Sequence, residues 1–335
     1  MTAVLFTCAG QRVDIVTAFG RAGATTIATD IDPLAPALYH ADAYAFVPRV
    51  EDAAYLESLR DLVRRYDVRL VVPLTDLDHE LLAAERDSLG DATVLLPALE
   101  VVRCTSDKYL SHRFFEERGI PSPASWLPDE LPPEPRFPVL VKARRGFGSR
   151  HIYRANDAAE LSFYIERTPV PSFVQSCCRG EEFSIDVLCD FEGRCLNAIP
   201  RTMIQSKGGE SIKGMTIREW DLIEFGRDVA EALPIWGPAN IQCFREDDRR
   251  YHVTDVNPRF GGGFPLPLAA GSRYPELALA LAEGERPSPS VGEFQERVVM
   301  TRFFSHLSLT SGPDGALEPF AEDVPEPIAS EPGEA

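Results

Sequence analysis

The chain has 335 residues, of which 44% are hydrophobic and 26% are charged, and its formal net charge is −18. This length is enough for two or three small domains with their own cores, and the composition is that of an ordinary globular protein. The excess of acidic residues argues against nucleic acid or an anionic membrane as the main partner, because both bind clustered Lys and Arg side chains. We expect small-molecule partners, with a homodimer as the candidate assembly.

Hydropathy and the use of cysteine and histidine limit the class further. No stretch approaches 18 consecutive apolar residues, and Met1 leads straight into a strand without a basic signal-peptide start, so we expect a cytoplasmic protein. The seven cysteines include no C-x-x-C pair, and the six histidines form no H-E-x-x-H motif. We therefore expect buried free thiols and no histidine metal site.

The first hundred residues alternate strand and helix patterns. Apolar, β-branched runs predict strands, and apolar residues at helical spacing predict helices between them. The order β-α-β-β-α-β predicts a small doubly wound parallel sheet, which belongs to the α/β class. The strands are expected near residues 3–8, 25–30, 44–48 and 68–73, and the helices near residues 13–19 and 55–66.

Ligands of such a sheet meet the carboxyl ends of its strands, which here lead into Gly10–Arg12 and Pro73–Asp76. The first turn lacks G-x-G-x-x-G, so NAD binding is disfavoured although Asp30 stands at the sequence distance of a ribose ligand. Asp76 is a candidate pocket residue. The polar residues Asp78–Glu80 are favoured as the capped first turn of a helix.

The middle of the chain carries a basic, glycine-containing turn. Thr105–Lys108 opens an amphipathic helix that Gly119 ends, and seven prolines between residues 121 and 138 predict a stiff connector. An apolar strand then reaches Lys142. Glycine backbone N–H groups beside cations form an anion cradle, so the turn after this strand is expected to face phosphates. Its polar and glycine members are Arg144, Arg145, Gly146, Gly148, Ser149 and Arg150.

A predicted hairpin, with arms at residues 239–244 and 251–257, carries oxygen-bearing side chains on one face. Alternation along the second arm places Asp255 and Asn257 on the same face, together with Val253. Two oxygen ligands then lie side by side.

The first arm supplies a third oxygen. If Glu246 pairs with Tyr251 across the turn, Gln242 lies directly opposite Asp255. One carboxylate and two amide oxygens, without imidazole or thiolate, suit Mg²⁺. Arg259 continues the same face and can neutralise charge on a transferred phosphoryl group. The alternative is that the Asn-Pro pair and the glycines after it are ordinary strand-ending residues.

Gln242, followed thirteen residues later by acid-x-Asn-Pro-Arg and then by small residues, resembles the metal-binding signature of the ATP-grasp ligases. Within that family it is similar to the carbamoyl-phosphate synthase large subunit. The family usually has Glu where this chain has Asp255. The shorter carboxylate can still bind one ion, and whether it supports a second ion is left open.

The resemblance implies an ATP-grasp fold in which MgATP lies between two domains. It implies a Rossmann-like domain over residues 1–103, a central lid over residues 104–174, and a palm of α+β character over residues 175–310. Residues 311–335 contain five prolines, seven acids and no Lys or Arg, which predicts a disordered tail.

The resemblance also implies roles for single residues. A solvated helix lysine is the alternative for Lys108, and a mobile surface loop is the alternative for the basic residues between 201 and 213. The implied ATP-contacting residues are Lys108, Lys142, Arg144, Gly146, Gly148, Ser149, Gln175, Cys177, Cys178 and Glu182, the metal ligands are Gln242, Asp255 and Asn257, and the catalytic residues are Arg259, Asn257, Lys207 and Arg201.

The activity implied is an ATP- and Mg²⁺-dependent ligation, with Mn²⁺ as an alternative ion. The γ-phosphoryl group of ATP passes to a carboxylate, and an amine attacks the resulting acyl phosphate, because phosphate is a much better leaving group than oxide. Two alternatives stay open. One is phosphorylation of bicarbonate or carbamate, as in carbamoyl-phosphate synthesis, and the other is a catalytically weakened ATP-binding regulatory protein, motivated by Asp255.

Overall fold

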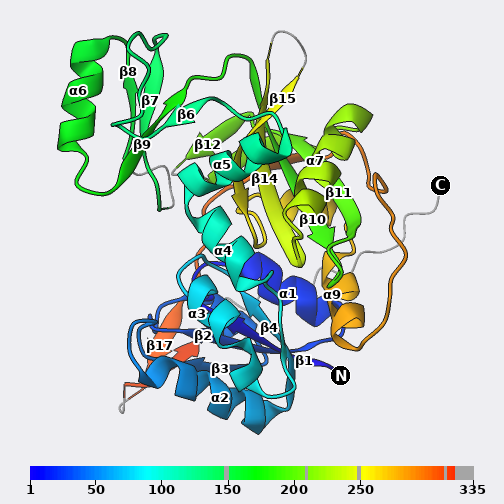
Figure 1. Ribbon diagram of the computed structural model, residues 1–335. Coiled ribbons are helices and arrows are strands. Elements are labelled where there is room, and N and C mark those ends of the chain that lie inside the picture. Colours follow the sequence, from blue (N-terminus) through cyan, green and yellow to red (C-terminus); the bar gives the residue numbers. More distant parts are fainter. Residues whose placement is uncertain (147–150, 208–209, 247–249, 313–314, 321–335) are drawn as a thin grey trace.

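The computed structural model describes residues 1–146, 151–207, 210–246, 250–312 and 315–320. Figure 1 shows a parallel sheet with its helices at one end of the molecule, an antiparallel region above it, and a small lobe that carries α6 and projects to one side. The expected α/β fold with an α+β C-terminal part is confirmed.

The N-terminal sheet has the strand order β3-β2-β1-β4-β5, and each neighbouring pair is parallel. All five residues of β1 are buried, as expected for a parallel strand with both faces covered. The order reverses between β1 and β4, so the loops after these strands meet at one place. The bounds are β1 Ala3–Thr7, α1 Val13–Arg21, β2 Thr25–Asp30, η1 Pro36–His40, β3 Ala43–Phe46, α2 Ala54–Tyr66, β4 Val68–Pro73, α3 His79–Ala84, η2 Arg86–Leu89 and β5 Thr93–Val94.

Two helices, α4 (Leu99–Ser106) and α5 (Lys108–Arg118), lead away from this sheet. The carboxylate of Asp107 caps α5 by accepting hydrogen bonds from two backbone N–H groups of its first turn. Gly119 ends the helix with a left-handed φ of 68°, a conformation that favours glycine. The predicted end at Gly119 is therefore confirmed, and the helix begins within the predicted opening, at Lys108, whereas Thr105 and Ser106 belong to the last turn of α4.

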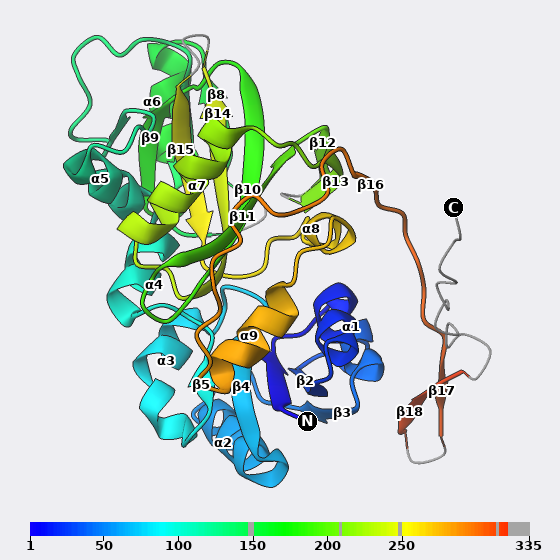
Figure 2. The same cartoon turned by 90° about the vertical axis from the view of Figure 1, so that its right-hand side faces the viewer.

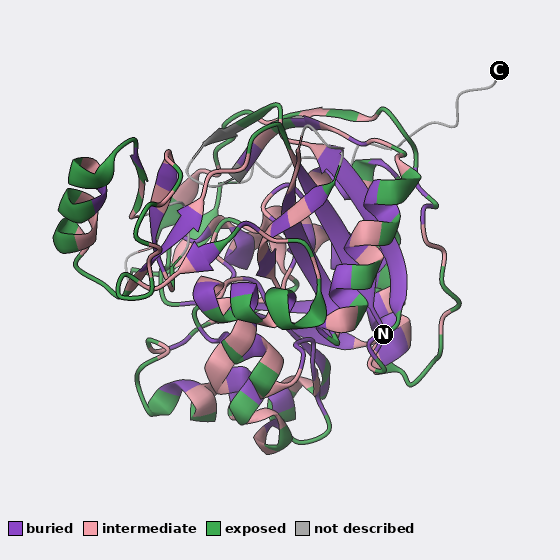
Figure 3. Cartoon of the chain, turned by 45° about the horizontal axis from the view of Figure 1, so that its top comes forward, coloured by how far each residue is buried: buried purple, intermediate pink, exposed green. Residues whose placement is uncertain are grey.

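The projecting lobe is a four-stranded antiparallel sheet of order β6-β9-β7-β8, with α6 packed against it. Its own core is small, and Figure 3 shows that most of the outer surface of α6 is exposed. The bounds are β6 Ser125–Trp126, β7 Val139–Ala143, β8 Ile152–Ala155, α6 Ala158–Arg167 and β9 Ser172–Ser176.

The larger C-terminal region is built on an antiparallel sheet of order β11-β10-β14-β15, whose strands are largely buried (Figure 3). Helix α7 packs on β10 and β11, and a second small sheet has the order β12-β13-β16. The bounds are β10 Glu181–Cys189, β11 Cys195–Thr202, β12 Gln205–Lys207, β13 Glu210–Met215, α7 Trp220–Ala232, β14 Gly237–Arg245, β15 Tyr251–Asn257, α8 Pro265–Ala269, α9 Tyr274–Ala282 and β16 Val299–Thr301.

One continuous hydrophobic core joins the N-terminal sheet to this region. Phe19 of α1 meets Phe260 edge-on, with ring centroids 6.0 Å apart, and Phe260 in turn meets Phe264 at 4.7 Å. In Figure 2, α8 and α9 lie between the N-terminal sheet and the antiparallel sheet. The segment after β15 is therefore fixed against the loops at the switch point of the parallel sheet. The domain limits stay a prediction, and two of them, 103/104 and 174/175, fall inside α4 and β9.

A short hairpin occupies the first part of the predicted tail. Strands β17 (Leu309–Ser311) and β18 (Leu317–Pro319) pair with each other in antiparallel register. The expectation of disorder from residue 311 onward is wrong for Ser311 and for β18, which lie in strands. Composition alone does not predict a hairpin whose two strands have only three residues each. Residues 321–335 lie outside the described part of the chain.

Candidate functional site

The three proposed metal ligands come together on β14 and β15. Gln242 pairs directly with Asp255, as predicted, and Asn257 follows two residues later on β15. All three side chains line the same cleft and are half-buried. One carboxylate and two amide oxygens form a hard donor set that fits Mg²⁺, which commonly binds through few protein ligands with phosphates completing its coordination.

The hairpin reaches this pairing by a different route from the one predicted. Tyr251 pairs with Arg245 rather than with Glu246, so the turn is one residue out of the expected register. The register then shifts beside Gln242, which brings Asp255 opposite it after all. This β-bulge is a feature that alternation along a strand does not reveal.

Because of the bulge, the side chains of two residues point to the opposite face from the one predicted. Val253, expected beside the ligands, is buried in the core. Thr254, expected to point away, lines the cleft and donates a hydrogen bond from Oγ1 to the carbonyl oxygen of Gln242 at 3.2 Å.

Lys108 lies against the candidate metal carboxylate. Its Nζ is 2.7 Å from Oδ2 of Asp255, and both side chains are 17% exposed. Lys108 begins α5, and its backbone N–H donates to the carbonyl oxygen of Arg144 at 2.8 Å. The backbone of Lys108 is thus fixed while its ammonium reaches into the cleft.

Lys142 is a buried cation in the same cleft. The side chain is 9% exposed, and its ammonium donates to Oε1 of Gln175 at 3.0 Å, while Nε2 of Gln175 donates to Oγ of Ser125. Burial lowers the pKa of Lys142, and the neighbouring carboxylate of Asp255 acts in the opposite direction. A buried ammonium bonded to a neutral amide is stabilised by an incoming anion.

Cys177, Cys178 and Glu182 line another part of the cleft. Both cysteines are free thiols, and burial together with the charge of Glu246 raises the pKa of Cys178 to about 12. These thiols are therefore neutral near pH 7 and unsuited to nucleophilic chemistry. Burial raises the pKa of Glu182 as well, and the positive charge of Lys142 opposes that shift.

The cleft has a volume of about 400 Å³ and includes eleven of the residues given an ATP-contacting, metal-binding or catalytic role from the sequence, besides Arg145 of the basic turn. Those are Lys108, Lys142, Gly146, Gln175, Cys177, Cys178, Glu182, Gln242, Asp255, Asn257 and Arg259. The apolar walls of the cleft, Leu140, Ile152 and Phe244, and the charged side chain of Arg154 were not predicted from the sequence. Leu140 and Phe244 lie two residues from Lys142 and Gln242 on β7 and β14, so alternation along those strands was an available signal. Ile152 and Arg154 lie on β8, from which no residue had been selected.

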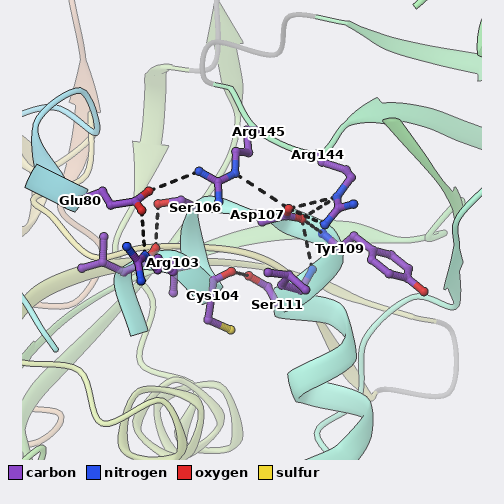
Figure 4. Close-up of polar contacts among 12 residues, drawn as sticks. Glu80, Arg103, Cys104, Ser106, Asp107, Tyr109, Ser111, Arg144 and Arg145 are labelled. Atoms are coloured by element: carbon purple, nitrogen blue, oxygen red, sulfur yellow. Dashed lines mark hydrogen bonds and ion pairs between the residues drawn. The ribbon is translucent and has the colours of Figure 1, made fainter. Parts of the chain in front are cut away.

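Arg144 and Arg145 form the base of the basic turn, as Figure 4 shows. Arg144 contacts Asp107 through Nε and Nη2, the latter at 2.7 Å, and lies 5.6 Å from the ring centroid of Tyr109. Arg145 donates to Glu80 at 3.4 Å. Arg145 lines the cleft, whereas Arg144 is not among the cleft-lining residues of the described chain. Its contact with phosphate stays a prediction, as do those of Gly148 and Ser149, which lie outside the described residues.

Arg259 connects the hairpin to the N-terminal sheet. Its guanidinium makes two hydrogen bonds to the carboxylate of Asp76, at 2.9 and 3.1 Å. Although burial alone raises the pKa of Asp76, the charge of Arg259 brings that pKa below its ordinary value. Arg12 contacts the same segment, donating to the carbonyl oxygens of Phe260 and Gly261, both at 3.1 Å. The loops that follow β1 and β4, which were predicted to lie at the ligand-binding edge of the sheet, therefore both contact the residues after β15.

The polar residues after Asp76 do not cap α3 as expected. Asp78 stands at the N-cap position but makes no side-chain capping bond, and its Oδ2 accepts instead from the hydroxyl of Tyr55 at 2.7 Å. Burial raises the pKa of Asp78. Glu80 reaches out to Arg103 at 2.8 Å, as Figure 4 shows.

Arg201 lies beneath the glycines rather than in the cleft. Its side chain is 2% exposed, and Nε donates to Oδ2 of Asp186 at 2.9 Å. A Cβ on Gly263 would lie 2.5 Å from Cζ of Arg201, so this position requires glycine for close approach. These contacts favour a structural role over the substrate contact that the resemblance implied.

Replacing Arg201 with Met should therefore reduce the stability of the protein. The change leaves the buried carboxylate of Asp186 without its guanidinium, which costs about 3–5 kcal/mol. Urea denaturation would measure this loss, with Arg227→Met on the exposed face of α7 as the control. Unchanged stability combined with a higher substrate KM would instead place Arg201 in contact with substrate.

The other two basic residues of the predicted acceptor segment lie on neighbouring strands. Lys207 ends β12, and its side chain lies outside the described part of the chain, so its catalytic role stays a prediction. Lys213 lies on β13, where it pairs with Gln205, and is exposed.

Two features are absent from the described residues. No group of three or more His, Cys, Asp or Glu side chains is placed to hold a metal ion, and no helix has both the length and the apolar character needed to cross a bilayer.

Two family models match the chain. Residues 4–96 match the PylC-like N-terminal domain, and residues 169–303 match the model described as ATP-grasp in the biosynthetic pathway with Ter operon. The fold is of the ATP-grasp class, and an ATP-grasp family model matches residues 169–303 of the chain.

Within this class the chain is similar to carbamoyl-phosphate synthases. It is 28% identical over 142 residues to the enzyme of Methanobrevibacter smithii, covering 40% of this chain and 38% of that protein. It is 26% identical over 282 residues to the carbamoyl phosphate synthase large chain of Agathobacter rectalis, covering 78% of this chain and 25% of that protein. The matched part is thus well under half the length of these curated relatives.

Solved structures share the fold at low sequence identity. A biotin carboxylase from Campylobacter jejuni superposes with a TM-score of 0.73 at 14% identity, covering 89% of this chain and 74% of that one. The biotin carboxylase domain of a Hydrogenobacter thermophilus 2-oxoglutarate carboxylase, solved with MgADP and bicarbonate, gives 0.72 at 18%, covering 89% and 73%. An L-amino acid ligase from Bacillus licheniformis gives 0.67 at 17%, covering 88% and 78%.

Proposed function

We propose that the protein is an ATP- and Mg²⁺-dependent ligase that activates a carboxylate as an acyl phosphate and transfers the acyl group to an amine. One observation carries the proposal. A single cleft brings the oxygen-bearing side chains of β14 and β15 together with two lysines from other elements, Lys108 and Lys142. This combination suits a metal-bound polyphosphate.

The walls of the cleft support one orientation of ATP. Leu140, Ile152 and Phe244 offer apolar surface to the base, and Glu182 is a candidate acceptor for the ribose hydroxyls. Lys142 and Lys108 supply positive charge for the phosphates. The metal would be held by Gln242, Asp255 and Asn257, and when bound it neutralises charge on the phosphate oxygens.

The proposed chemistry has two steps. A carboxylate oxygen of the substrate attacks the γ-phosphorus, a new O–P bond forms, and the bond to the β-phosphate oxygen breaks to release ADP. The amine nitrogen then attacks the acyl carbon, a C–N bond forms, and inorganic phosphate leaves while the amine gives up a proton. The cations of the site stabilise the charge that develops on oxygen in both steps.

Arg259 is the proposed contact for the transferred group, and Asp76 holds it in place. Asp76→Asn should lower kcat/KM by about ten-fold, since a misplaced catalytic cation costs rate, while ATP affinity stays the same. Steady-state kinetics and ATP titration would separate these effects. Asp76→Glu, which keeps the carboxylate, should recover part of the activity. Equal loss of ATP affinity in Asp76→Asn would mean that this pair belongs to the nucleotide site instead.

Phosphorylation of bicarbonate or carbamate is the second candidate. It is favoured by the similarity to carbamoyl-phosphate synthases, which extends over 78% of this chain in one relative. In that case bicarbonate alone should stimulate ATP consumption.

The test is an ADP-release assay with Mg²⁺, run against pools of carboxylic acids, with and without pooled amines, and separately with bicarbonate. Stimulation that requires an acid and rises with an amine supports the ligase. Stimulation by bicarbonate without an added acid supports the second candidate. Tight MgATP binding without ADP release under any condition would indicate a nucleotide-binding protein and contradict both.

A further inference from the structure

The ion pair between Lys108 and Asp255 joins two residues with different proposed partners. Asp255 supplies the only carboxylate of the proposed metal ligands, and Lys108 is a proposed phosphate contact. In the structure, Nζ and Oδ2 lie 2.7 Å apart and both side chains are 17% exposed. A charge-assisted hydrogen bond of this length occupies an oxygen that the metal would use.

Three cations around this pair each have a protein carboxylate nearby. Lys108, Lys142 and Arg259 line the cleft together with the hairpin ligands, as do Arg145 and Arg154. Lys108 contacts Asp255, Arg259 contacts Asp76, and Lys142 is influenced by both Asp255 and Glu182. A bare divalent cation would disturb these pairings, because it would take Asp255 and leave the ammonium of Lys108 beside a second positive charge.

We propose that Lys108 is a positioning residue that blocks the metal-binding oxygen of Asp255 until nucleotide binds. The metal then binds to the site together with ATP and not alone. The inference rests on the function proposed above. When the nucleotide binds, the ammonium of Lys108 exchanges its hydrogen bond to Asp255 for one to a phosphate. The carboxylate of Asp255 is then free to bind the metal. Each charge exchanges one opposite partner for another, which keeps the cost of breaking the pair low.

The surrounding structure allows this exchange to be a side-chain movement alone. Asp107 caps the helix that begins at Lys108, and the backbone N–H of Lys108 is bonded to the carbonyl oxygen of Arg144. On the other side, Asp255 is held in the β14–β15 ladder opposite Gln242. Both backbones are therefore fixed, and only the flexible stem of the lysine has to move.

The experiment measures Mn²⁺ binding to the nucleotide-free protein by electron paramagnetic resonance. In the wild type, binding of Mn²⁺ alone should be weak. Lys108→Met removes the competing ammonium and should tighten the binding of Mn²⁺ alone by about ten-fold or more, the equivalent of one charge-assisted hydrogen bond. The same variant should bind ATP more weakly than the wild type.

Three further variants make the result specific. Arg145→Met removes a positive charge from the same cleft without freeing a metal ligand, because Arg145 contacts Glu80. It should change Mn²⁺ affinity by no more than about two-fold, as expected for a screened charge. Lys108→Arg keeps the charge and should keep Mn²⁺ binding weak. The double variant Lys108→Met, Asp255→Asn should lose the gain, which would locate the bound ion at Asp255.

Each outcome supports or overturns the proposal. A gain confined to Lys108→Met and dependent on Asp255 supports it. A Lys108→Met affinity that matches that of Arg145→Met, or tight Mn²⁺ binding by the nucleotide-free wild type, overturns it while leaving the proposed ligase intact. If Mn²⁺ binds none of the variants, with or without ATP, both the exchange and the proposed metal site are wrong. Circular dichroism of each variant checks that a loss of binding is not a loss of fold.

Discussion

Asp255→Asn should reduce ATP turnover by on the order of 10³-fold, because the proposed metal contributes several kcal/mol to stabilising the transition state and each 1.4 kcal/mol is about a factor of ten in rate. The substitution keeps the size of the side chain and removes its charge. The fold should survive, since the amide keeps the shape of the side chain and this position stays in the β14–β15 ladder opposite Gln242. Turnover at saturating Mg²⁺ and a thermal melt would measure the two effects.

Two companion variants separate a metal ligand from a general effect of charge. Asp255→Glu restores the carboxylate that the resembled family usually has here and should keep turnover within about ten-fold of the wild type. Asp61→Asn removes a carboxylate on α2 that is 65% exposed and pairs with Arg64, and should change nothing. Asp255→Asn with full activity would show that the cleft does not use this residue for a metal.

Lys142→Met should weaken ATP binding by about 10–100-fold, which is the loss expected for one hydrogen bond from a charged group. The reason is its position, since an ammonium 9% exposed and bonded to a neutral amide is available to an anion. Titration with ATP would measure the affinity, with Lys213→Met, on the exposed side of β13, as the matched control. Affinity within about two-fold of the wild type would mean that the phosphates lie elsewhere.

The same variant should alter how stability depends on pH. Burial lowers the pKa of Lys142 in the folded state, so over the range between that pKa and the ordinary lysine value of about 10.4 the unfolded chain binds more protons. This group therefore makes the wild type more stable as pH rises through that range. Lys142→Met lacks the contribution, so its stability relative to the wild type should fall as pH rises. A pH-independent difference in melting temperature would contradict the buried, charged state of Lys142.

The candidate site was largely predictable from short segments because its chemistry is carried by residue types. Gln242, Asp255 and Asn257 were selected as hard oxygen donors, and the structure brings them to one cleft with Lys108 and Lys142. Their roles as ligands stay a prediction. The pairing of Gln242 with Asp255 was predicted correctly but for the wrong reason. Tyr251 pairs one residue earlier on β14 than expected, and the bulge at Thr254 then restores the expected register.

Partnerships between distant segments were not predictable in the same way. Nothing in the sequence indicates that Arg259 bonds to Asp76, 183 residues earlier, or that Lys108 contacts Asp255, 147 residues later. The burial of Arg201 was not predictable either, and its catalytic role stays a prediction. Its basic, glycine-containing surroundings resembled a substrate loop, but the packing of Gly263 against its guanidinium makes it part of the interior.

Local sequence was enough to predict the parallel N-terminal sheet, the beginning and end of α5 and the chemical character of the site, because hydrophobic periodicity, capping residues and ligand chemistry act over a few neighbouring residues. Long-range packing sets which cations neutralise which carboxylates, which arginine is buried, and which side chains of each strand point into the cleft. Those outcomes depend on long-range packing of the parallel sheet against the antiparallel one, and on a one-residue bulge. Electrostatic partners are chosen by distance in space, and the separations along the chain do not encode that distance.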